Sequence, residues 1–172
     1  MEYRVSERAY MITQEALKEI LHYDPETGNW TWLVDVGRVY AGDRAGCFVD
    51  GRGYRKVSIR RTKFYLHRLA FLYMNGEWPK AQVDHINLVK SDMRWSNLRE
   101  ATRSQNYGNR DAYANNSSGF KGVWWHKQCQ KWAAEIRVNR KGIKLGLFDS
   151  PTAAHSAYVA AAQKYFGEFA RA

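Results

Sequence analysis

The chain has few cysteines and prolines and lacks any long hydrophobic run. Its 172 residues include two cysteines, Cys47 and Cys129, which lie far apart and outside any Cys-x-x-Cys pair. This spacing excludes a zinc site built from cysteines and argues against a disulfide framework. No apolar run approaches the roughly 18 residues that a membrane span needs, and the start of the chain, MEYRVSERAY, has no signal-peptide pattern. We therefore expect a soluble, cytoplasmic protein with no membrane partner.

Acidic residues are scarce in two separate segments. Residues 38–68 carry nine basic and two acidic side chains, and residues 120–172 carry nine basic and three acidic ones. Residues 1–37 are the opposite, with three basic and seven acidic side chains, while the whole chain has a net charge of +10. A strongly basic chain favours an anionic partner, with nucleic acid ahead of acidic lipid. The two basic segments predict that this partner is contacted in two places.

The first part of the chain reads as a mixed α and β domain. With 45% hydrophobic residues and 25 aromatic ones, the chain has enough apolar surface for a core. Helical spacing, alternation and turn residues predict these elements. They are a helix over 13–22 capped by Thr13, a strand containing Trp30 and Trp32, a hairpin over 49–69 with Val57 and Ile59 on one face and its turn at RRTK, and a helix over 67–75 stopped by Gly76.

The last part of the chain has a different residue pattern, which predicts a separate module. The segment 109–118 is polar and has no period, so we expect a linker there. Three short strands follow, KGVWWHK, KWAAEIRVN and KGIKLGLF, and then a helix that Ser150 caps and Gly167 ends. Small residues and tyrosines on that helix form a stripe that faces the sheet: Ala154, Ala157, Tyr158, Ala161 and Tyr165.

The polar segment 83–106 carries the residues that suit phosphodiester hydrolysis. Asp84 and His85 are adjacent; a histidine titrates near neutrality and can deprotonate water, while a carboxylate suits a hard divalent ion. Thr102 and Gln105 have the spacing of a capping box, which places Asn106 on the first or second turn of a helix. Asn97 opens a second short strand, where its amide can bond to backbone groups of the loop 86–96.

These residues stand in three motifs, DHIN (84–87), KSDMRWSNLR (90–99) and ATRSQN (101–106). Together they resemble the His-Asn-His (HNH) endonucleases of the ββα-metal fold, most closely the homing-type branch of phages and introns. The resemblance covers roughly residues 14–110 and includes the upstream segment LHRLAFLYMNGEWP. It implies Asp84 and Asn106 as ligands of one Mg²⁺ or Mn²⁺ ion, His85 as general base and Asn97 as the residue that orients the loop.

Two loop residues leave the family pattern. Leu88 stands where glycine is common, and Met93 replaces the asparagine that usually follows the aspartate. Both departures affect the expected rigidity of the loop more than its expected chemistry. The last position is Asn106, as in the homing branch, where many relatives have histidine. One alternative stays open: a decayed site in which Asp84 and Asn97 only hydrogen-bond the backbone.

The strand KWAAEIRV alternates cleanly between two faces. We expect Trp132, Ala134, Ile136 and Val138 to pack on the helix, together with Trp125. The opposite face offers Lys131 and Arg137 to a DNA groove, joined by Lys121, His126 and Lys144 from the neighbouring strands.

This module resembles the plant ethylene-response-factor (APETALA-type) DNA-binding domain over nearly all of KGVWWHKQCQKWAAEIRVNRKGIKLGLFDSPTAAHSAYVAAAQKYFG. The resemblance implies a DNA-contacting face on which Glu135 and Arg137 match by type. Trp124, His126 and Lys144 occupy positions where the plant domains carry arginine or tryptophan, so their target sequence does not transfer. In the first domain, Arg55, Arg60 and Arg61 belong to a basic hairpin that we expect to contact phosphates.

Together these patterns predict an α+β protein with three parts. They are an HNH endonuclease domain over 1–108 with a ββα-metal core at about 80–108, a linker over 109–118, and a DNA-binding domain over 119–172 made of a three-stranded antiparallel sheet packed on one helix. The expected function is metal-dependent nicking of double-stranded DNA by a phage-encoded or bacterial protein, monomeric or homodimeric, without a small-molecule cofactor. The alternatives are a catalytically silent DNA-binding regulator on the same scaffold and an RNA-directed nuclease. The target sequence, the strand cut, the oligomeric state and the preferred ion do not follow from the sequence.

Overall fold

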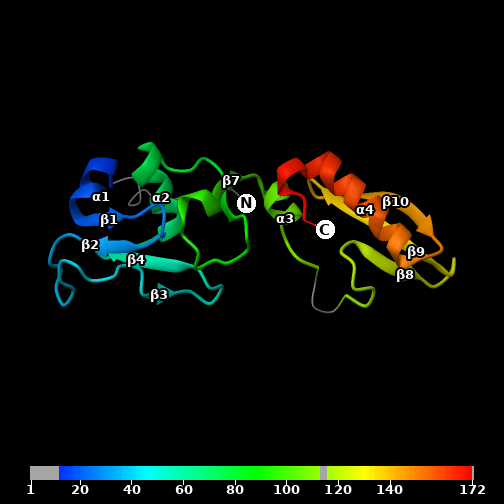
Figure 1. Cartoon of the computed structure of the whole chain (residues 1–172), viewed down its shortest axis with the longest axis horizontal. Helices are drawn as coiled ribbons and strands as arrows, with labels where there is room; N and C mark the ends of the chain where they lie inside the picture. The colour runs from blue at the N-terminus through cyan, green and yellow to red at the C-terminus, as the bar shows by residue number, and fades with distance from the viewer. Residues whose placement is uncertain (1–11, 113–115, 172) are drawn as a thin grey trace. The chain divides into compact units, whose positions relative to one another are not determined.

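The computed structural model describes residues 12–112 and 116–171, which form two compact units that divide between Glu100 and Ala101 (Figure 1). The sequence placed the end of the first domain later, at residue 108. The short helix that follows residue 102 therefore belongs to the second unit. Part of the expected linker over 109–118, residues 113–115, lies outside the described residues, as does the segment 1–11.

The first unit opens with helix α1 (Gln14–Ile20). The helix begins where predicted because the Thr13 hydroxyl accepts a hydrogen bond from the Ala16 N–H at 3.2 Å. It ends earlier than predicted, because the next residues form strand β1 (Leu21–Tyr23), which pairs antiparallel with β2 (Trp30–Trp32). Both β2 tryptophans, Trp30 and Trp32, are buried.

A three-stranded antiparallel sheet and a helix follow. The strands are β3 (Phe48–Val49), β4 (Arg55–Ile59) and β5 (Thr62–Tyr65), in the order β3-β4-β5. The predicted shared face of Val57 and Ile59 is confirmed, and both residues are buried. The hairpin turn is tighter than expected: Arg60 and Arg61 have positive φ, while the Thr62 and Lys63 of RRTK already belong to β5. Helix α2 (Leu66–Asn75) then ends at Gly76, as predicted.

The last part of the first unit carries the polar segment singled out above. Strand β6 (Gln82–His85) pairs with β7 (Leu98–Ala101), and a short 3-10 helix, η2 (Trp95–Asn97), leads into β7. The apolar core of the unit joins α1, α2, the small sheets and the loop through Met93. At its centre the rings of Tyr23 and Trp30 stack with their centroids 4.6 Å apart.

The second unit begins with α3 (Arg103–Gly108) and contains the sheet β10-β9-β8. Its strands are β8 (Val123–His126), β9 (Lys131–Val138) and β10 (Lys141–Phe148), all antiparallel. Helix α4 (Pro151–Phe166) begins at the Ser150 cap and leads into η3 (Gly167–Phe169). Figure 1 shows α4 lying along this sheet. The predicted three-stranded sheet and capped helix are confirmed.

Two residues depart from the expected packing of the second unit. Helix α4 packs through Ala154, Tyr158 and Ala161, but the stripe continues through Ala162 and Phe166, and Tyr165 is 40% exposed. The expectation that Trp125 lies in the core is also wrong. Trp125 pairs with Trp132 across the strands and its ring meets that ring edge on, yet it is 43% exposed. It sits near the end of the sheet, one residue before β8 ends, where little chain covers it.

The turn between β1 and β2 makes a close backbone contact that gives a first prediction. Gly28 has φ +73°, and a Cβ there would collide with the carbonyl carbon of Met93 and lie 2.5 Å from the Arg94 nitrogen. Gly37 has a similar φ of +64°, but a Cβ there would have nothing within 4 Å.

We expect Gly28→Ala to lower the free energy of unfolding by about 3 kcal/mol, because backbone strain and a backbone clash add. Gly37→Ala adds the strain alone and should cost about 1 kcal/mol. Urea titrations followed by tryptophan fluorescence measure both. An equal loss of unfolding free energy in the two variants would show that the loop around Met93 moves away from the new Cβ without an energetic cost.

Candidate active site and nucleic-acid interface

Strand β6 ends on the two residues that the sequence marked for catalysis. Asp84 is 4% exposed and His85 is 3% exposed, so neither side chain is an ordinary surface group. A buried carboxylate is costly unless a cation or several hydrogen bonds compensate its charge. The surroundings of the pair therefore decide what it can do.

Arg99, on the neighbouring strand β7, supplies that compensation for Asp84. Its Nε lies 3.0 Å from Asp84 Oδ2, and both side chains are largely buried. The ion pair holds the carboxylate in a fixed orientation. A carboxylate has two oxygens and about four lone pairs, so it can accept several contacts at once. The sequence prediction did not include Arg99, although it stands in the NLR motif.

Aromatic rings surround the imidazole of His85. The ring of His67, on α2, meets it edge on at 5.4 Å between centroids, and the ring of Tyr54 lies 6.0 Å away. Burial lowers the pKa of His85 below its ordinary value, and nearby Lys90 adds to this, while Asp84 and Asp92 act in the opposite direction. A lowered pKa keeps the imidazole neutral near pH 7, which is the form that accepts a proton.

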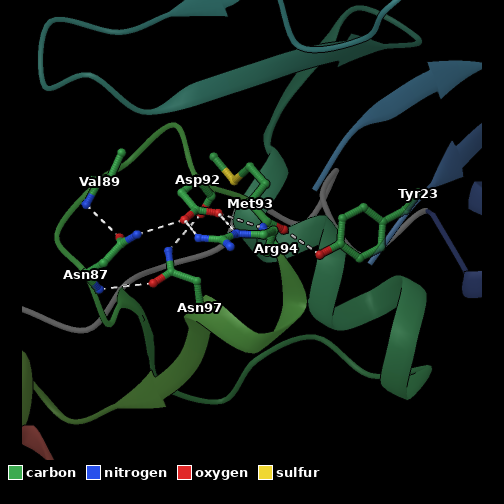
Figure 2. A network of polar contacts seen from close by, with 7 residues as sticks. All are labelled: Tyr23, Asn87, Val89, Asp92, Met93, Arg94 and Asn97. Atoms are coloured by element: carbon green, nitrogen blue, oxygen red, sulfur yellow. Dashed lines mark hydrogen bonds and ion pairs between the residues drawn. The ribbon is translucent and has the colours of Figure 1, made fainter. Parts of the chain in front are cut away.

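Asn97 holds both sides of the loop between β6 and β7 (Figure 2). Its Oδ1 accepts a hydrogen bond from the Asn87 N–H at 3.0 Å, and its Nδ2 donates to the Asp92 carbonyl at 3.0 Å. Asn87 in turn donates through Nδ2 to Asp92 Oδ2 at 2.7 Å. Arg94 contacts Asp92 with two nitrogens, and mainly this contact lowers the pKa of Asp92 to about 2.

The back of the same loop is fixed to the core, which explains one departure from the family pattern. Met93 is buried in the core of the first unit, and its carbonyl accepts a hydrogen bond from the Tyr23 hydroxyl at 2.5 Å (Figure 2). Leu88 has φ +65°, the left-handed region that favours glycine. The loop therefore contains one strained residue at Leu88 and one apolar anchor at Met93.

Asn106 lies on α3, in the second unit, and is half-buried. The predicted capping box is confirmed: the Thr102 hydroxyl accepts from the Gln105 N–H at 3.2 Å, and the Gln105 side chain accepts from the Thr102 N–H at 2.8 Å. Asp84 lies in the first unit, so the assignment of both residues to one metal ion stays a prediction.

The donor set fits a hard cation by its chemistry. Mg²⁺ prefers carboxylate and amide oxygens, binds through one or two protein groups and keeps several waters. Within the described part of the chain, no group of three or more His, Cys, Asp or Glu side chains is placed to hold an ion.

The strand register of the second unit gathers the predicted DNA-contacting residues on one face of the sheet. Trp124 pairs with Ala133, His126 with Lys131, and Lys144 with Glu135, so the side chains of these pairs lie on the face that carries Arg137. Arg137 and Lys144 are exposed, and Trp124 is 41% exposed. We call this surface the outer face; the opposite face packs on α4 through Ala134 and Ile136.

Lys121 departs from that arrangement. It precedes β8 and is half-buried, and its Nζ donates to the carbonyls of Gly108 at 2.6 Å and Arg171 at 2.7 Å. Burial lowers the pKa of Lys121 to about 8. In the first unit, Arg60 and Arg61 are exposed at the tip of the hairpin, whereas Arg55 is half-buried.

Sequence reasoning missed the groups that support the predicted residues. Arg99 is the last residue of the motif KSDMRWSNLR and contacts a residue on another strand, and the Tyr23 contact joins residues 70 positions apart. His67 stands in the segment LHRLAFLYMNGEWP, and only the ring distances show that it lies against His85. Spacing along the chain gives no signal for such contacts.

Two families match separate parts of the chain. Residues 64–107 match the family described as HNH endonuclease, and residues 118–168 match the AP2 domain. The first range contains all four predicted catalytic residues, and the second contains the sheet and α4. The chain thus contains one segment similar to HNH endonucleases and one similar to the AP2 domain, which confirms both resemblances.

Among solved structures, the chain is similar to one described as DNA binding and cleavage by the HNH homing endonuclease I-HmuI. The two are 17% identical, with a TM-score of 0.41, and the match covers 86% of this chain and 85% of that chain. No match is found among curated proteins. Within residues 12–112 and 116–171, no helix has the length and apolar character to cross a bilayer.

The buried ring beside His85 gives a prediction for stability against pH. Burial, with His85 and Arg68 adding to it and Asp50 opposing it, lowers the pKa of His67 to about 3. Among the described side chains, His67 Nδ1 is one of the buried atoms without a hydrogen-bond partner. Below about pH 6.5 the imidazole of His67 takes up a proton in the unfolded chain but stays neutral in the folded chain.

The free energy of unfolding should therefore fall as the pH drops from about 6.5 towards 3, by up to about 1.4 kcal/mol for each pH unit. His67→Phe keeps a ring in place and should flatten this dependence by about one proton. His22→Phe is the matched control, since His22 is exposed on β1. Urea titrations at pH 7, 6, 5 and 4 measure how the free energy of unfolding changes with pH. An unchanged slope in His67→Phe would contradict the assignment of this dependence to His67.

Proposed function

We propose that the chain is a metal-dependent DNA endonuclease of the homing type, with the AP2 domain as its DNA-reading module. The observation that carries the proposal is the buried Asp84-His85 pair at the end of β6, beside a loop held by Asn97, inside the range that matches the HNH endonuclease family. The charge distribution and the AP2 match support double-stranded DNA as the partner.

In the proposed mechanism, His85 accepts a proton from the attacking water. Its lowered pKa keeps the imidazole neutral near pH 7, and the rings of His67 and Tyr54 limit its orientations. Asp84, oriented by Arg99, and Asn106 are the groups that would hold Mg²⁺ or Mn²⁺. When bound, such an ion would supply Lewis-acid stabilisation of charge on the scissile phosphate and the leaving 3′-oxygen. Asn97 keeps the loop in the position that this arrangement needs.

The outer face of the second unit is the proposed reading surface. Arg137 is suited to guanine O6 and N7 in a major groove, while Lys131, His126 and Lys144 are suited to phosphates. Trp124 and Glu135 complete the face. The exposed hairpin residues Arg60 and Arg61, together with Arg55, add a second, sequence-independent contact with phosphates. Because one site cuts one strand, we propose that a monomer nicks DNA and that a double-strand cut in one event needs a homodimer.

Supercoiled plasmid incubated with Mg²⁺ tests the activity. Wild-type protein should convert it to the open circle, and His85→Ala should lower the rate by about 10²–10⁴-fold, the usual contribution of a general base. His22→Ala, at an exposed position on β1, should nick like the wild type.

An intact plasmid over a wide range of protein concentrations, or unchanged nicking by His85→Ala, would refute the nuclease mechanism. DNA binding without nicking would identify a silent DNA-binding regulator. Faster cleavage of structured RNA than of duplex DNA would identify an RNA-directed enzyme.

A second prediction concerns the reading surface. Lys144→Gln removes one charge from the outer face and should lower the slope of log affinity against log salt by about 0.9, because one fewer counterion is released. Lys164 is exposed on α4, away from that face, so Lys164→Gln removes an equal charge and should leave the slope unchanged. Fluorescence anisotropy with a labelled duplex at several salt concentrations makes the comparison. Equal slopes in both variants would place the DNA elsewhere.

A further inference from the structure

Helix α3 is packed as part of the second unit. Ala101, just before it, is buried in the apolar cluster of that unit with Ile136, Tyr158 and Phe166. At the other end of the helix, Gly108 approaches α4 so closely that a Cβ there would lie 2.7 Å from Phe166 Cγ. The apolar contacts that fix α3 therefore come from the sheet and helix of the AP2 domain.

Polar contacts fix both ends of α3 to the same unit. Near its start, the Ser104 hydroxyl accepts a hydrogen bond from the Asn139 N–H at 3.0 Å, at the turn between β9 and β10. At its end, Lys121 donates to the Gly108 carbonyl at 2.6 Å, and the Arg171 N–H donates to the same carbonyl at 3.3 Å. A lysine at the last carbonyls of a helix is also favourable for the helix dipole.

A helix of this length depends on such contacts. The α3 helix has six residues, whereas isolated helices shorter than about 12–15 residues are marginal in water. Its capping box satisfies N–H groups at its start but does not set the direction in which it points. The direction comes from Ser104, Gly108 and Lys121, through their contacts in the second unit.

The same helix borders the surface that would carry DNA. A groove of about 200 Å³ is lined by Tyr107 and Arg110, from α3 and the residues after it, and by Trp124, Glu135 and Arg137 of the outer face. A duplex bound on the outer face would therefore lie beside the helix that carries Asn106.

We infer that the AP2 domain positions Asn106 for the nuclease reaction, with Ser104 and Lys121 as the positioning residues, so that the reading module is part of the catalytic machinery and more than a DNA tether. The inference rests on the proposed function, because it concerns the ligand role of Asn106. It also gives Lys121 a role different from the DNA contact expected from the sequence.

Steady-state nicking by full-length variants tests the inference. Ser104→Ala and Lys121→Met remove the two anchors, Ser104→Thr keeps the hydroxyl, and Lys127→Met removes an exposed lysine of the same unit as the matched control. The readouts are the nicking rate at saturating DNA, the affinity for DNA without metal, and the Mg²⁺ concentration that gives half the maximal rate. Circular dichroism checks that each variant is folded.

We expect the anchor variants to lose about 10- to 100-fold in saturated rate, since misplacing a group by about 1 Å has an effect of this size. They should need more Mg²⁺ but bind DNA within about threefold of the wild type. Ser104→Thr and Lys127→Met should behave like the wild type.

Folded anchor variants with the wild-type saturated rate and Mg²⁺ dependence would overturn the inference while leaving the proposed function intact. A loss confined to DNA affinity would overturn it as well, because Lys121 and Ser104 would then serve binding alone. A wild-type protein that never nicks would refute the proposed function itself, and the inference with it.

Discussion

The two hydrogen bonds of the Asn97 amide hold together the part of the molecule on which the proposed chemistry depends. One bond fixes the start of the loop at Asn87 and the other fixes its far side at Asp92. The distance across the loop between β6 and β7 is therefore fixed. Since β6 ends on Asp84 and His85, this constraint determines where the carboxylate and the imidazole emerge. The Arg99 ion pair and the rings around His85 then act on groups whose backbone is already fixed.

The departures from the family pattern are explained by how this chain supports its loop. Met93 fills the core, and its carbonyl is bonded by Tyr23 from the β1 strand, so the loop is anchored from behind by apolar packing and one short hydrogen bond. Leu88 stays in a left-handed conformation that glycine would adopt without strain. A loop with that much support tolerates one unfavourable residue.

Local patterns predicted most of the secondary structure, because caps and alternation act over a few residues. The Thr13 cap, the Thr102-Gln105 capping box, the alternation of β9 and the end of α2 at Gly76 all follow from neighbours in sequence. Features that depend on partners far along the chain did not follow from such patterns. The exposure of Trp125 follows from how little chain covers the end of the sheet, the Arg99 contact needs two strands, and the membership of α3 in the second unit needs Phe166 and Lys121. The same limit applies to the site: its residues are recognisable in sequence, and their supports are not.

The proposed reaction is hydrolysis of a phosphodiester bond with the 3′-oxygen as leaving group and His85 as base. The chemistry of the cut ends tests this most directly. We expect DNA ligase to seal the nicks left by the wild-type protein with Mg²⁺, because hydrolysis of this kind leaves a 3′-hydroxyl beside a 5′-phosphate. His85→Ala should leave almost no nicks to seal. Nicks that ligase cannot close, or sealable nicks that appear equally with His85→Ala, would contradict the proposed reaction.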